Sequence, residues 1–219
     1  LMDLRHPNIV QVFEANAAQG QYFISMELLG ETLSDALAKL RASKQLMPQA
    51  KALLIARQVA AALGFAHEKS LVHRDVKPSN VLIAHDPGGR TRYVLSDFGV
   101  VKDTGATRLT HTEMTIGTPA YMSPEQIRGL PLDPRSDIYS FGCVMFELVT
   151  GKLPYTGESP NDLLNKHIAA PLPSPLVAND NVTPEFAAII RSMMAKRPDE
   201  RPESMWELLK TLRVTKIFK

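Results

Sequence analysis

Residues 73–80 of this chain read His73-Arg74-Asp75-Val76-Lys77-Pro78-Ser79-Asn80, and residues 97–99 read Asp97-Phe98-Gly99. Asp75 offers a carboxylate that can accept a proton, and Lys77 places a positive charge beside it. Asn80 and Asp97 add an amide oxygen and a second carboxylate, ligands that suit Mg²⁺ because this hard cation binds oxygen and takes few protein ligands. The two segments therefore combine a base, a cation and a pair of metal ligands.

This combination suits the transfer of a phosphoryl group. In that reaction the protein positions an acceptor hydroxyl group and neutralises the negative charge that spreads over the phosphate oxygens. Asp75 is then the expected base for the hydroxyl group, whereas Asn80 and Asp97 are expected to hold the metal ion beside the phosphates. The residue types thus indicate phosphoryl-transfer chemistry.

The same motifs resemble those of the protein kinase family, whose catalytic loop reads H-R-D-x-K-P-x-N and is followed by D-F-G. Ser123-Pro124-Glu125 stands where that family has A-P-E. The ending Lys-Pro-Ser-Asn resembles Ser/Thr kinases rather than Tyr kinases, and residues 117–121 agree, because Thr118 matches a family threonine that touches the catalytic Asp and Lys. Residues 116–126 and 135–140 look similar to the bacterial eukaryotic-like (Hanks-type) kinases.

The resemblance implies an α+β fold, the bilobal protein kinase fold, made mainly of the helical C-terminal lobe. Residues 1–219 are then a single kinase domain that is incomplete at its start, with 1–29 as a remnant of the N-terminal β lobe and hinge and 30–219 as the C-terminal lobe. The sequence contains no G-x-G-x-x-G motif, and the family's Gly-rich loop, strand Lys and helix Glu are expected before Leu1. We therefore expect little or no kinase activity from the 219-residue chain alone.

Composition and charge limit the partners of the chain. A formal net charge of +2 is too small to indicate binding of nucleic acid, so the implied polyanion is ATP. Cys143 is the single cysteine and cannot form an internal disulfide, which indicates a reducing compartment. No apolar stretch reaches the roughly 18 residues that a membrane span needs. The chain is expected in the cytoplasm, by itself or as the cytoplasmic part of a longer membrane protein.

Hydrophobic periodicity and capping residues predict the main elements. Strands are expected at residues 8–13, 21–28, 81–84 and 92–96, and residues 1–4 are expected to end a helix. Helices are expected to begin after Thr32 as N-cap, at Pro48, at Thr183-Pro184 and at Pro202-Glu203. A further helix is expected over residues 135–150, ending at Gly151.

The nucleotide-binding half of the site is known here only through the resemblance. It implies ATP as the phosphoryl donor with Mg²⁺, or alternatively Mn²⁺, as the metal ion. Met26 resembles the gatekeeper at the back of the adenine site, and Glu27 and Leu29 resemble the hinge that hydrogen-bonds adenine. Leu82 matches the residue below the base, and Glu31 is a candidate for the ribose.

Other residues resemble the structural framework of the family. Asp137 matches the helix-start aspartate that hydrogen-bonds the catalytic-loop backbone. Glu125 and Arg201 resemble a buried ion pair that ties the S-P-E segment to the last helices. A hydrophobic spine between the lobes is expected from His73, Phe98, Val12 and, as a further member, Leu1.

Regulation and substrates follow from the same resemblance. Thr110 and Thr112 occupy the place where bacterial kinases of this type autophosphorylate, and a phosphate there could pair with Arg74. A dimer would allow autophosphorylation between copies. The expected substrates are proteins with Ser or Thr hydroxyl groups.

Two alternatives to a Ser/Thr protein kinase stay open. One is a pseudokinase scaffold that binds partners without catalysis, although a scaffold needs none of the side chains at Asp75, Lys77, Asn80 and Asp97. The other is a kinase-fold enzyme that acts on small molecules, although residues 117–125 resemble a platform for a peptide acceptor.

Overall fold

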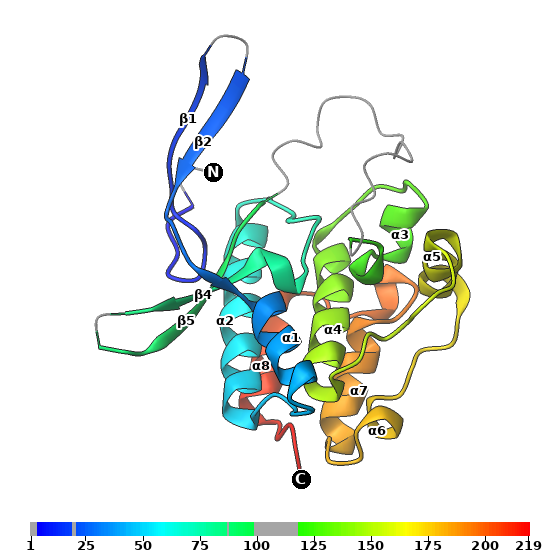
Figure 1. Ribbon diagram of the computed structural model, residues 1–219. Coiled ribbons are helices and arrows are strands. Elements are labelled where there is room, and N and C mark those ends of the chain that lie inside the picture. Colours follow the sequence, from blue (N-terminus) through cyan, green and yellow to red (C-terminus); the bar gives the residue numbers. More distant parts are fainter. Residues whose placement is uncertain (1–3, 19–20, 87, 99–117) are drawn as a thin grey trace.

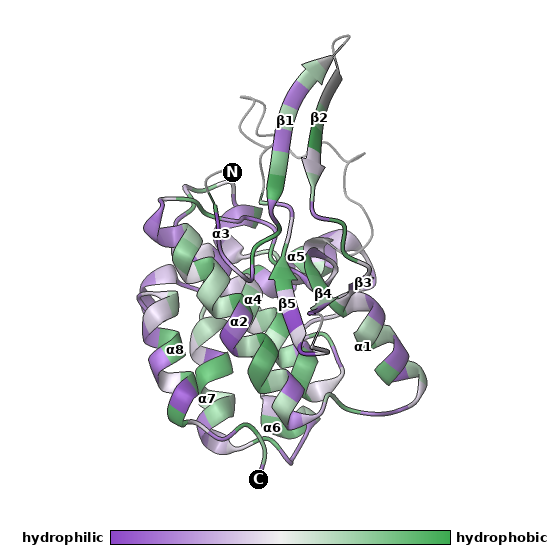
Figure 2. Cartoon of the chain, turned by 90° about the vertical axis from the view of Figure 1, so that its left-hand side faces the viewer, coloured by the Kyte–Doolittle hydropathy of each residue, from purple (hydrophilic) through white to green (hydrophobic). Residues whose placement is uncertain are grey.

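The computed structural model describes residues 4–18, 21–86, 88–98 and 118–219. Figure 1 shows a helical body from which a two-stranded hairpin projects. The hairpin pairs β1 (Val12–Ala18) with β2 (Gln21–Met26) in antiparallel register, and a bulge or irregularity falls between Val12 and Glu14. The large side chains of Phe13 and Phe23 on this hairpin are 59% and 44% exposed. Figure 2 shows the hydrophobic residues on both strands of the hairpin.

The helical body is built around α4 (Pro134–Thr150), because nearly every residue of this helix is buried. Helix α2 (Gln49–Glu68) packs against α4, α8 (Met205–Val214) and strand β5 (Thr91–Leu95), while α4 also contacts α7 (Pro184–Met193). The remaining helical elements are α1 (Leu33–Ala42), α3 (Pro124–Ile127), α5 (Pro160–Ala169) and α6 (Pro175–Ala178), with short 3-10 turns η1 (Pro78–Asn80), η2 (Thr118–Tyr121) and η3 (Pro198–Glu200). Within the described residues, no helix is both long and apolar enough to cross a membrane.

A small antiparallel sheet positions the motif residues. It runs in the order β3 (Glu31–Thr32), β4 (Val81–His85) and β5, and Val81 pairs with Leu95 at the end nearest the motifs. Strand β4 directly follows Asn80, and β5 ends two residues before Asp97. The sheet therefore brings residues 73–80 and 97–98 to one edge.

Local capping chemistry confirms several predicted helix ends. Thr32 forms a capping box with Asp35 at the start of α1, and the Thr183 side chain accepts a hydrogen bond from the backbone of Phe186 in α7. Helix α4 ends at Gly151, whose φ of 70° lies in the left-handed region that glycine adopts without strain. Helix α2 begins after Pro48 as predicted.

Two predicted elements are misplaced by three residues or more, and the second strand ends at Met26 rather than at residue 28. The first strand covers residues 12–18 rather than 8–13, because Ile9 and Val10 are buried beside β5, where the Val10 N–H donates to the Leu95 carbonyl at 2.9 Å. The last helix begins at Met205 rather than at Pro202, because the Ser204 side chain accepts the Glu207 N–H as N-cap. The helix end predicted at residues 1–4 lies largely outside the described residues.

Candidate active site

Asp137, in the first turn of α4, fixes the backbone of residues 73–74. Its carboxylate accepts hydrogen bonds from the backbone N–H of His73 at 2.8 Å and of Arg74 at 2.9 Å. The imidazole Nε2 of His67 lies 2.8 Å from the same carboxylate. Arg74 has a φ of 68°, which is rare for a residue with a side chain, so these contacts hold the loop in a strained conformation. The structure thus places Asp137 where the sequence predicted it.

His73 joins this loop to the segment that carries Asp97. It is fully buried, its Nδ1 accepts the N–H of Asp75 at 3.2 Å, and its Nε2 therefore carries the proton that is donated to the Ser96 carbonyl at 2.8 Å. Burial lowers the pKa of His73, although the nearby carboxylate of Asp137 acts in the opposite sense. The imidazole packs on Phe98 with ring centroids 4.5 Å apart. His73 is thus a neutral packing and hydrogen-bonding residue, as the spine prediction expects.

Asp75, Lys77 and Asn80 form one cluster. The Lys77 ammonium donates to the Asp75 carboxylate at 2.8 Å, and the Asn80 amide nitrogen donates to the Asp75 backbone carbonyl at 2.8 Å and to its carboxylate at 3.2 Å. The side chain of Asp75 is 24% exposed, so solvent or a substrate can reach it. This geometry offers a base that is already oriented by two donors.

Asp97 lies beside Asn80 because Ser96 links the two segments. The Ser96 N–H donates to the Asn80 carbonyl at 2.9 Å, and the φ of Asp97 is 57°. In the described residues, the side-chain hydrogen bonds of Asn80 all use its amide nitrogen, which leaves the amide oxygen to serve as a ligand. A carboxylate and an amide oxygen are a donor set that fits Mg²⁺ together with phosphate oxygens.

The residues assigned to the nucleotide pocket lie along the connection between the hairpin and the body. Glu27 is engaged by Arg92 at 2.9 Å, and Glu31 is paired with Lys39 at 2.8 Å. Leu29 and Leu82 pack together against a small buried cluster of Val10, Ala84 and Val94. Met26 ends β2 and is 39% exposed. Leu29 and Leu82 thus pack on the same buried cluster, whereas the carboxylates of Glu27 and Glu31 are committed to ion pairs.

A third segment reaches the catalytic loop from α3. Ser123 and Gln126 form a capping box, and the Gln126 side chain donates to the Arg74 carbonyl at 2.6 Å. Asp75 lines a hollow of about 10 Å³ together with Tyr121 and Met122. Asp75 therefore lies next to the segment that the sequence assigned to the acceptor. Thr118 belongs to η2 by its backbone, but its side chain, like Thr110 and Thr112, lies outside the described residues.

Glu125 and Arg201 make the buried pair that the sequence predicted. The guanidinium contacts both carboxylate oxygens, at 2.6 and 2.8 Å. Burial acts to raise the pKa of Glu125, but the hydrogen bonds and charge of Arg201 hold it below its ordinary value. The remaining Arg201 donors reach the backbone carbonyls of Ala195, Arg135 and Lys196. Arg201 thus ties α3 to the start of α4 and the segment after α7.

Sequence reasoning missed His67 and Gln126 as supports of the loop. His67 belongs to no motif, and its separation of six residues from His73 is not the i, i+4 spacing of a helical metal pair. Its contact with Asp137 joins residues 70 positions apart, and no local pattern signals such a contact. For Gln126 a signal existed, because Ser followed three residues later by Gln is a capping-box pattern.

The chain matches the family model described as "Protein kinase domain" over residues 1–212. It is 38% identical over 202 residues to serine/threonine-protein kinase PrkC of Bacillus subtilis, covering 92% of this chain and 30% of PrkC. It is 36% identical over 213 residues to serine/threonine-protein kinase PknB of Mycolicibacterium smegmatis, covering 94% of this chain and 33% of PknB. The chain thus spans about a third of the length of these relatives.

Solved structures agree with these relatives. The crystal structure of the Mycobacterium tuberculosis PknI kinase domain matches with a TM-score of 0.74 and 25% identity, covering 96% of this chain and 73% of that one. The predicted fold class is confirmed: the helical body corresponds to the large lobe of that fold, and the hairpin contributes a small β portion.

Proposed function

Because the chain belongs to the protein kinase family, we propose that it carries the acceptor and metal half of a site that transfers the γ-phosphoryl group of ATP to Ser or Thr hydroxyl groups of proteins. The observation that supports this most is the cluster of Asp75, Lys77 and Asn80, which Ser96 joins to Asp97. Asp75 also lines the same hollow as Tyr121 and Met122.

Each side chain has a role that follows from its contacts. Asp75 accepts the proton of the acceptor hydroxyl group. At the same time the hydroxyl oxygen bonds to the γ-phosphorus, and the bond from that phosphorus to ADP breaks. Lys77 holds the Asp75 carboxylate and adds positive charge next to the transferred group. Asn80 and Asp97 would hold Mg²⁺, which neutralises phosphate charge when bound.

The nucleotide would bind between the hairpin connection and β4. Met26 is proposed at its back, the backbone of Glu27 and Leu29 at its edge, and Leu82 below the base. Glu31 is proposed as the ribose contact, which would require it to leave Lys39. Residues 1–29 would then belong to the small lobe and hinge, and 30–219 to the large lobe.

A scaffold without catalysis is less well supported. Asp75 and Asn80 hydrogen-bond each other, and Lys77 pairs with Asp75, so that their polar atoms meet in a partly exposed site, and partner binding alone gives no reason for that arrangement. Lys77 adds a cation and Asp97 adds a second carboxylate, so the four residue types together match those that phosphoryl transfer needs.

The test is a radiolabelled ATP assay on the product of the complete gene, with Mg²⁺ and a mixture of Ser- and Thr-containing peptides. We expect Asp75→Asn to slow transfer by roughly 10²–10⁴-fold, the usual contribution of a positioned base. The matched control is Asp199→Asn, a surface carboxylate paired with Arg197, which should keep full activity. Equal rates in Asp75→Asn and the parent would refute the assignment, and no transfer by the parent would favour the scaffold.

A further inference from the structure

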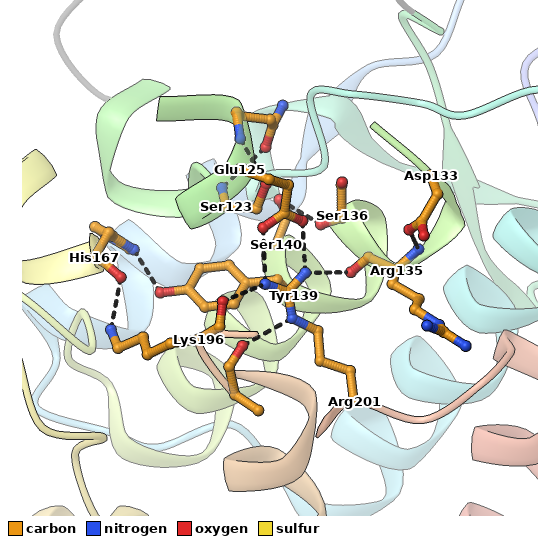
Figure 3. A network of polar contacts seen from close by, with 12 residues as sticks. Ser123, Glu125, Asp133, Arg135, Ser136, Tyr139, Ser140, His167, Lys196 and Arg201 are labelled. Atoms are coloured by element: carbon orange, nitrogen blue, oxygen red, sulfur yellow. Dashed lines mark hydrogen bonds and ion pairs between the residues drawn. The ribbon is translucent and has the colours of Figure 1, made fainter. Parts of the chain in front are cut away.

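Lys196, which follows α7, directs its side chain to the end of α5 (Figure 3). Its ammonium donates to the backbone carbonyls of His167 at 2.7 Å and Lys166 at 3.1 Å and to the Tyr155 hydroxyl at 2.9 Å. The Lys166 carbonyl also accepts the Ala170 N–H at 3.0 Å. Carbonyls in the last turn of a helix otherwise lack helical partners, and a cation there also interacts favourably with the helix dipole. Lys196 therefore caps the C-terminal end of α5 from another segment.

No carboxylate balances this charge in the described contacts. The ammonium lies 4.4 Å from the centre of the Tyr155 ring and 5.9 Å from that of Tyr139, so its charge faces aromatic rings and carbonyls. The other ionisable groups that act on it are Cys143, Arg201 and Arg128. Burial lowers the pKa of Lys196 to about 8, so the charged form is held at a cost in stability at neutral pH.

Helix α5 packs directly against η2, and His167 lies near the C-terminal end of α5. This imidazole is fully buried, and its Nδ1 lies 2.9 Å from the Tyr139 hydroxyl. Burial and the charge of Lys196 lower the pKa of His167 to about 4, and the backbone of Ala120, in η2, acts in the opposite sense. Its Nε2 makes no hydrogen bond within the described residues. The ring is therefore neutral at pH 7 and lies between α4 and η2.

Tyr139 is the common neighbour of these groups. In Figure 3 its ring lies between His167 and the Arg201 guanidinium, whose central carbon is 4.9 Å from the ring centre. Helix α4 also holds η2, because Glu147 accepts a hydrogen bond from the Tyr121 hydroxyl at 2.5 Å. The segment η2 thus contacts both α4 and α5.

We propose that Lys196 is a positioning residue for the protein substrate, because by capping α5 it holds His167 against η2, the segment next to Asp75. Only the assignment of η2 as the segment that binds the protein substrate rests on the proposed function. The chain of contacts from Lys196 through α5 to η2 does not depend on it.

The first test is amide hydrogen exchange on the 219-residue chain, which needs no activity. Lys196→Met keeps an apolar stem on the tyrosine rings and removes the ammonium. Lys210→Met, on the exposed face of α8, is the matched control. We expect exchange at residues 164–169 and at Ala120 and Tyr121 to become about five- to tenfold faster in Lys196→Met only, which corresponds to the loss of about one net hydrogen bond.

The outcomes are separable. Local acceleration with an unchanged or higher melting temperature supports positioning, because removing a buried charge does not weaken the fold. Unchanged exchange in α5 and η2 would overturn the proposal, and so would uniform acceleration with a lower melting temperature, which indicates a merely structural role.

The second test uses the complete gene product in the peptide assay. Lys196→Met should raise KM for the acceptor peptide about five- to tenfold and leave KM for ATP unchanged, and Lys210→Met should change neither. An unchanged peptide KM in an active enzyme would refute substrate positioning by Lys196. Faster local exchange in a protein without any kinase activity would instead support the chain of contacts and refute the proposed function.

Discussion

Removing the carboxylate of Glu125 should destabilise the fold severely. The Arg201 side chain is 0% exposed and that of Glu125 is 6% exposed, so Glu125→Gln leaves a guanidinium buried without a counter-charge. Breaking a buried pair in this way costs roughly 3–5 kcal/mol. Because a domain is stable by only about 5–15 kcal/mol, this variant would lose a large share of its free energy of unfolding.

Urea titration at pH 7, followed by circular dichroism, measures the loss. Glu158→Gln is the control, because this exposed carboxylate lies before α5 and should change stability by less than about 0.5 kcal/mol. The double variant Glu125→Gln with Arg201→Met should lose less than the sum of the two single variants, because the orphaned charge is then gone. A loss below about 1 kcal/mol in Glu125→Gln, or full additivity, would refute the reasoning.

The same pair predicts the pH dependence of stability. Arg201 holds the pKa of Glu125 below its ordinary value in the folded state, so the unfolded chain binds a proton at a higher pH than the folded chain does. The stabilisation is therefore fully present above about pH 4.5, near the ordinary carboxyl pKa, and is lost as pH falls through the folded pKa. The difference between the parent and Glu125→Gln should shrink on acidification over that range.

Three further predictions use other groups. The pKa of Lys196 is about 8 in the folded chain, against an ordinary value of 10.5, so the folded chain binds fewer protons than the unfolded chain above about pH 8. The parent should therefore gain stability relative to Lys196→Met between about pH 8 and 10, as measured by urea titration. His67→Phe should lose about 1.5–3 kcal/mol by the same assay, because a hydrogen bond to the buried Asp137 carboxylate disappears, whereas the exposed His85→Phe should lose little. Mass spectrometry of the active complete gene product should find phosphate on Thr110 or Thr112, and unmodified peptides would contradict that assignment.

Helix ends were predictable because capping is a local interaction. Thr32 and Asp35 satisfy each other's hydrogen bonds within one turn. At the start of α7, the Thr183 side chain accepts the N–H of Phe186, again within one turn. The first strand was misplaced for the opposite reason. The apolar pattern of residues 8–10 is real, but its partner is Leu95, which lies far along the chain, so periodicity alone could not tell which sheet it joins.

The candidate site shows the same division. Asp75, Lys77, Asn80 and Asp97 were assigned from their chemistry, because few residue types can act as base, cation and metal ligand, and their roles stay predictions. The residues that support the loop could not be found from their chemistry, because they act from other elements. His67 contacts Asp137, and Gln126 donates to the Arg74 carbonyl. The ion pairs of Glu27 with Arg92 and of Glu31 with Lys39 were likewise invisible to motif comparison.

These long-range supports explain how a strained loop can present its polar side chains. Arg74 and Asp97 both have positive φ, and each such residue costs about 1–3 kcal/mol unless its surroundings enforce it. Asp137 holds the N–H of Arg74 and Gln126 holds its carbonyl, while Ser96 is held by Asn80 before Asp97. These contacts bind backbone atoms, whereas the Asp75 carboxylate accepts hydrogen bonds only from Lys77 and Asn80 among the described contacts. The helical body therefore stabilises the backbone conformation of the site without using the Asp75 carboxylate.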